Sequence, residues 1–187
     1  MMPLERCRRS RCSLCTRWYC WNVDVHTLPA DLLSVCQATE LSPKHALAYT
    51  YLGTELHAQN HTDDALQALE KAIGLDPSIY AAHHNAGMVI LDAISDMNQT
   101  SEEVELLRDS AAVHFQDALD LEPNSVASTY SLGTTHHAGG RVREALRHYY
   151  KVLDLEPNHK KALEKLPELE RDARHEDVLD AVGDIDL

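Results

Sequence analysis

Proline, glycine and alanine recur along this chain at fixed offsets, and this repetition constrains the fold more than any other feature. Three glycines each lie ten residues after a proline: Gly53 after Pro43, Gly87 after Pro77 and Gly133 after Pro123. Three alanines each lie twelve residues before a proline: Ala65, Ala111 and Ala145. Successive prolines are therefore 34, 46 and 34 residues apart. Such a period is typical of a chain built by stacking copies of one short structural unit.

Each unit is predicted to fold as a pair of helices. Apolar residues recur every three or four positions over residues 46–56, which is helical and not strand periodicity. A second helix is expected to begin at Thr62, an N-cap residue followed by two aspartates that suit the helix dipole, and to end before Pro77. The small residues Gly53 and Ala65 are expected where the two helices approach each other closely.

The middle unit carries twelve additional residues. They lie between Gly87 and Ala111, because the interval from glycine to alanine is 24 residues there and 12 in the other two units. The sequence of residues 100–103, TSEE, has the pattern of a capping box, which marks a helix start. We therefore expect longer helices that project about 9 Å beyond their neighbours. Residues 95–107 are interpreted as an extra contact surface.

The three units resemble the tetratricopeptide repeat (TPR), a 34-residue helix pair with an aromatic residue at position 4, Leu-Gly at 7 and 8 and alanine at 20 and 27. Residues 46–79 match at Tyr49, Leu52, Gly53, Ala65, Leu69, Ala72 and Pro77. Residues 80–125 match at Gly87, Ala111, Phe115, Ala118 and Pro123. Residues 126–159 match at Leu132, Gly133, Ala145, Tyr149 and Pro157. The pattern is broken at His83, Ala86, Thr129 and Val152. The resemblance implies an all-α fold, a right-handed solenoid of antiparallel helix pairs whose matching residues form the core.

Composition and repeat register divide the chain into three parts. Residues 1–27 form an arginine- and cysteine-rich leader that is expected to be disordered. Residues 28–166 form the TPR array, which begins with the second helix of a truncated unit. Residues 167–187 form an acidic capping helix and tail. Pro167 stands at the place of the repeat glycine, where it is expected to break or kink the helix that begins after Pro157.

Four cysteines in the leader leave several interpretations open. Cys12 and Cys15 have the spacing of zinc ligands, with Cys7 and Cys20 nearby. A structural zinc site usually separates its two ligand pairs by a longer loop, so we favour an unstructured leader. A zinc-dependent nucleic-acid binder and an organelle-targeting peptide are the alternatives. Because the repeat body makes little use of cysteine, the expected location is cytoplasmic.

Charge and motif content exclude several functional classes. The net charge of −13 argues against nucleic acid or an anionic membrane as the partner. The sequence has no run of 18 apolar residues that could span a bilayer. It also has no phosphate-binding loop, dinucleotide fingerprint, nucleophile elbow or HExxH motif. We therefore expect no enzymatic activity, no cofactor and no metal.

The resemblance implies a concave groove lined by the first helix of each unit. The residues expected to line it are Thr50, Thr54, His57, Ala81, His84, Asn85, Met88, Tyr130, Thr134 and His137. A metal site formed by the groove histidines would need rings from neighbouring helices to converge, and is not favoured. Because the chain has twelve histidines, several of them in or beside the groove, we expect weaker binding of cationic partners near pH 6 than near pH 8.

The same register narrows the choice of partner. TPR co-chaperones that hold the acidic C terminus of heat-shock chaperones use lysine, arginine and asparagine at five groove positions. This chain has Thr50, Thr54, Asn85, Tyr130 and Thr134 there. Only the asparagine fits, and a carboxylate cannot be clamped without cations. The asparagine ladder known from O-GlcNAc transferase is also broken, because Asn85 is the only asparagine of the three ladder positions.

The predicted function is that of a protein-protein interaction scaffold or adaptor. It binds a peptide segment or a helix of a partner protein in the groove and performs no chemistry. A substrate-selecting repeat region of a larger enzyme, such as an O-GlcNAc-type glycosyltransferase, is the alternative.

Overall fold

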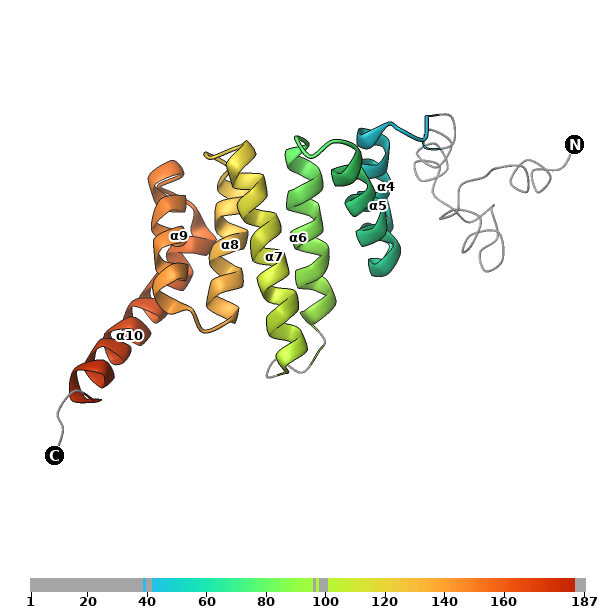
Figure 1. Ribbon diagram of the computed structural model, residues 1–187. Coiled ribbons are helices and arrows are strands. Elements are labelled where there is room, and N and C mark those ends of the chain that lie inside the picture. Colours follow the sequence, from blue (N-terminus) through green and yellow to red (C-terminus); the bar gives the residue numbers. More distant parts are fainter. Residues whose placement is uncertain (1–38, 40–41, 96, 98–100, 184–187) are drawn as a thin grey trace, which may run out of the picture. The chain divides into compact units, whose positions relative to one another are not determined.

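The computed structural model describes residues 39, 42–95, 97 and 101–183, and within these ranges every regular element is a helix (Figure 1). The helices are α4 (Ala46–Ala58), α5 (Thr62–Leu75), α6 (Tyr80–Ser95), α7 (Glu102–Leu121), α8 (Val126–Ala138), α9 (Val142–Leu155) and α10 (Lys160–Gly183). The all-α prediction is thereby confirmed. The leader (residues 1–27) and nearly all of the truncated preceding unit lie outside the described residues. None of the described helices is long and apolar enough to cross a membrane.

Short turns join the helices of the first and third pairs, and each turn contains one residue in the left-handed backbone conformation. Asn60, between α4 and α5, has φ 61°, and Gly140, at the equivalent place between α8 and α9, has φ 70°. Glycine and asparagine tolerate this conformation best. The first turn is closed by the backbone, because the N–H of His61 donates to the carbonyl of Leu56 (2.9 Å). Helix α5 begins at Thr62, as predicted, but Thr62 is its first residue and not its N-cap, which is His61.

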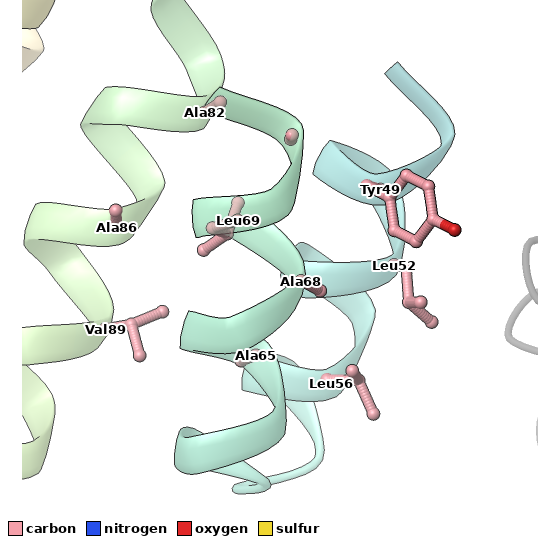
Figure 2. Close-up of a cluster of buried hydrophobic side chains, with 10 residues drawn as sticks. Tyr49, Leu52, Leu56, Ala65, Ala68, Leu69, Ala82, Ala86 and Val89 are labelled. Carbon is pink, nitrogen blue, oxygen red and sulfur yellow. The ribbon is translucent and has the colours of Figure 1, made fainter. Parts of the chain in front are cut away.

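The chain divides into two compact units, Met1–Val89 and Ile90–Leu187. In the first unit, buried side chains of α4, α5 and the start of α6 form one cluster (Figure 2). The cluster comprises Tyr49, Leu52, Leu56, Ala65, Ala68, Leu69, Ala72, Ala82, Ala86 and Val89. A Cβ atom added at Gly53 would lie 2.5 Å from Cγ of Leu69 and 3.0 Å from the carbonyl oxygen of Ala65. The predicted close approach of the first two helices is therefore confirmed.

The second unit contains α7 to α10, and buried side chains of α9 and α10 form a cluster there. The cluster comprises Val142, Ala145, Tyr149, Val152, Ala162, Leu166 and Leu169. Helix α10 continues through Pro167, so a break at this proline, one of the two predicted effects, does not occur. Leu166 and Leu169, on either side of the proline, are both buried. This packing holds both parts of the helix in place although the proline removes one backbone hydrogen bond.

The twelve additional residues lengthen both helices of the middle pair and the linker between them. Helix α6 has 16 residues where α4 and α8 have 13, and α7 has 20 where α5 and α9 have 14. The six extra residues at the start of α7 add about 9 Å of helix. The N-cap is Ser101, whose hydroxyl accepts from the N–H of Val104 (3.3 Å). The third helical residue is thus a valine, so the predicted capping box is wrong and a simple serine cap takes its place.

Candidate functional site

In the first unit, the predicted contact residues lie on α4 and on the first turns of α6. We call them the α4–α6 face: Thr50, Thr54, His57, Ala81, His84, Asn85 and Met88. The amide of Asn85 donates to the hydroxyl of Thr54 (2.9 Å), which in turn donates to the carbonyl of Thr50 (2.9 Å). This chain of hydrogen bonds joins two helices across 31 residues of sequence. It fixes two polar side chains at positions where they can meet a partner.

The remaining residues of this face differ in how much of each is accessible. Thr50 is only 4% exposed, and its hydroxyl donates to the carbonyl of Ala46 (3.2 Å), so little of it is available for contact. His57, Ala81 and Met88 are half-buried. The half-buried ring of His84 stacks on Tyr80 with 5.7 Å between ring centroids. Burial lowers the pKa of His84, which therefore gains its charge at a lower pH than an ordinary histidine.

In the second unit, the predicted contact residues form the α8 face: Tyr130, Thr134 and His137. All three are half-buried. The hydroxyl of Thr134 donates to the carbonyl of Ser131 (2.8 Å). The ring of His137 meets Tyr149 edge to face at 6.5 Å. The α8 face therefore presents two aromatic rings and a hydroxyl.

Two residues that the sequence reasoning missed stand beside Tyr130. The ring centroid of Tyr149, on α9, lies 5.6 Å from that of Tyr130, and the ring of His159 lies 4.9 Å from it. His159 is also the N-cap of α10, since its Nδ1 accepts from the N–H of Ala162 (3.2 Å). His45 caps α4 in the same way, through the N–H of Ala48 (3.2 Å). The position of both histidines just before a first helix could have indicated the capping role.

A further histidine pair lies between α8 and α9. The rings of His136 and His148 stack at 5.3 Å. Burial, and then the neighbouring His136, lowers the pKa of His148 to about 4. Burial also lowers the pKa of His136, with a smaller contribution from Arg141. The lowered pKa values favour the neutral form of both rings, which suits a stacked and partly buried pair.

Comparison with protein-family models identifies two stretches of the repeat region. Tetratricopeptide-repeat family models match residues 46–79 and 108–160. The chain belongs to the tetratricopeptide-repeat family. Its TPR fold is that of an all-α solenoid, as the sequence predicted.

The relatives and solved structures are distant in sequence. The chain is 26% identical over 137 residues to cell division cycle protein 27 homolog A of Arabidopsis thaliana, covering 71% of this chain and 17% of that protein. The first TPR of Spaghetti (RPAP3), bound to the HSP90 peptide SRMEEVD, is 20% identical with a TM-score of 0.61, covering 70% of this chain and 94% of that one. The second TPR domain of human RPAP3, in complex with the HSP70 peptide SGPTIEEVD, is 20% identical with a TM-score of 0.58, covering 67% and 95%. The chain spans less than a fifth of the curated relatives it matches.

Proposed function

We propose that this TPR protein is an interaction scaffold that binds a peptide segment or a helix of a partner protein and performs no chemistry of its own. Contacts come from the α4–α6 face and from the α8 face. The observation that carries the proposal is that half-buried polar and aromatic side chains stand on these first helices, in a fold shared with peptide-bound TPR domains. Half-buried side chains of this kind add contact area on binding and lose little entropy, because packing already restrains them.

The partner segment is proposed to differ from the acidic peptides held by the solved neighbours. Those peptides end in EEVD. Of the residues at the clamp positions in this chain, Thr50 is buried, Thr54 and Asn85 bond to each other, and Tyr130 is an aromatic. None of these carries a cation that could pair with a carboxylate. A neutral or basic segment therefore suits the two faces better.

Affinity capture from cell extract with matched variants tests the proposal. Tyr130→Ala removes an aromatic ring from the α8 face. Tyr150→Ala removes one from α9, where Tyr150 is 47% exposed. Partners held by the first-helix faces should be lost with Tyr130→Ala and kept with Tyr150→Ala, while both proteins keep the wild-type helical content. Equal capture by wild type and Tyr130→Ala, or loss only with Tyr150→Ala, would contradict the proposal.

A further inference from the structure

Three aromatic rings meet where α8, α9 and the start of α10 come together, and a carboxylate follows them in the second turn of α10. We call this group the aromatic notch: Tyr130, Tyr149, His159 and Glu164. The rings of Tyr149 and His159 are tilted by 42° and 44° against that of Tyr130, so the three do not stack as parallel plates. Burial, and then the negative charge of Glu164, raises the pKa of Tyr130, so this carboxylate acts electrostatically on the ring.

We propose that the aromatic notch binds a basic side chain, an arginine or a lysine, of the partner segment. The inference rests on the proposed function, since it names the chemistry that one part of the α8 face recognises. It commits to a single occupant, a positively charged side chain of a protein.

The electrostatics of the notch favour a cation. The faces of tyrosine rings carry negative electrostatic potential, and a guanidinium or ammonium group within about 6 Å of a ring centroid is attracted to them. Glu164 adds a negative charge whose field reaches the Tyr130 ring. The chain as a whole carries −13, which steers positively charged partners towards it.

The hydroxyl of Tyr149 is a second observation that points to a ligand. Tyr149 is fully buried, and its Oη has no hydrogen-bond partner within the described part of the chain. A buried polar group without a partner is costly, and a phenolic oxygen can accept from a guanidinium or an ammonium N–H. Tyr130, the neighbouring ring, is only half-buried. Tyr149 thus packs against a ring that a partner can reach.

The chain itself supplies a weak competitor. Nζ of Lys160 lies 3.9 Å from Oε1 of Glu164, one turn away on α10. The two side chains are 87% and 62% exposed, and such surface pairs contribute little free energy. A partner cation that also contacts the rings can therefore displace Lys160. It follows that removal of Lys160 should strengthen binding.

The test uses two small probes and the 187-residue chain. N-acetyl-L-arginine methylamide and N-acetyl-L-glutamate methylamide are titrated separately while the ring signals of Tyr130 and His159 are followed by aromatic carbon-13 NMR. We expect saturable shifts of both rings with the arginine probe only. Glu164→Gln should weaken the binding about threefold, whereas Glu103→Gln, an exposed carboxylate on α7, should leave it unchanged. Lys160→Gln should strengthen it.

A further variant separates the ring of His159 from its capping role. His159→Ser removes the ring but keeps an oxygen that can cap α10. It should lose binding of the arginine probe while helical content remains. The inference is overturned if the arginine probe gives no saturable shift, if the glutamate probe binds as well, or if Glu164→Gln binds as wild type does. Such a result alongside Tyr130-dependent capture of a partner would refute the notch and leave the interaction function standing.

Discussion

The close approach of α4 and α5 makes replacement of Gly53 by alanine a demanding test of the fold. A new Cβ atom would lie 2.5 Å from Cγ and 2.9 Å from Cδ2 of Leu69, and 3.0 Å from the backbone oxygen of Ala65. The leucine side chain can rotate away, but the carbonyl belongs to the facing helix, so the helices must separate. Overpacking of this kind costs about 1–3 kcal/mol. Alanine recovers at most about 1 kcal/mol of helix propensity.

After subtraction of this recovery, we expect Gly53→Ala to be net destabilising by up to about 2 kcal/mol, which corresponds to roughly 2–4 °C in Tm for each kcal/mol at this chain length. Gly74→Ala is the matched control, because no atom lies within 4 Å of the Cβ position in this exposed helical residue. It should raise stability by up to about 1 kcal/mol. Urea and thermal unfolding followed by circular dichroism measure both. Equal or greater stability of Gly53→Ala relative to wild type would refute the packing of α4 against α5.

Two further predictions concern the second unit. Because the pKa of His148 falls from 6.5 to about 4 on folding, its contribution to stability is complete above pH 6.5 and is lost as the pH falls towards 4. Urea midpoints should thus drop more between neutral pH and pH 5 for wild type than for His148→Gln, and parallel drops would count against the buried pair. Ser101→Ala removes a cap worth about 1 kcal/mol, so it should speed hydrogen exchange at the start of α7. Ser101→Asp, which keeps a capping oxygen, should not. Unchanged exchange in Ser101→Ala would contradict the assigned cap.

The repeat spacing predicted most of the helical architecture. The fixed offsets among proline, glycine and alanine gave two helices in each unit and located the insertion, because local packing between paired helices repeats from unit to unit. Helix caps were less well predicted. Thr62 has the residue type of an N-cap, but His61 takes that position at the end of a turn closed by a backbone hydrogen bond. Residues 100–103 have the pattern of a capping box, but the cap of α7 is Ser101. Small shifts of this kind depend on turn geometry that residue types alone do not determine.

The candidate site was predicted in part. The register placed Thr54 and Asn85 on adjacent first helices, and the structure joins them by a hydrogen bond. The aromatic notch escaped sequence reasoning because its members come from three helices and Tyr149 matches a core position of the repeat. The position of His159 before a first helix indicates a helix cap, but it does not indicate a contact with the Tyr130 ring. Contacts among α8, α9 and α10 depend on how the helices pack, which no single-unit pattern encodes.

The measurement that tests the central claim most directly is chemical-shift mapping of the full chain with a partner segment obtained by affinity capture. If the first helices bind the partner, the largest amide perturbations will fall on α4, α6 and α8, with strong shifts around Asn85 and Tyr130. Perturbations concentrated on α5, α7 and α9 would contradict the account and assign binding to the second helices instead.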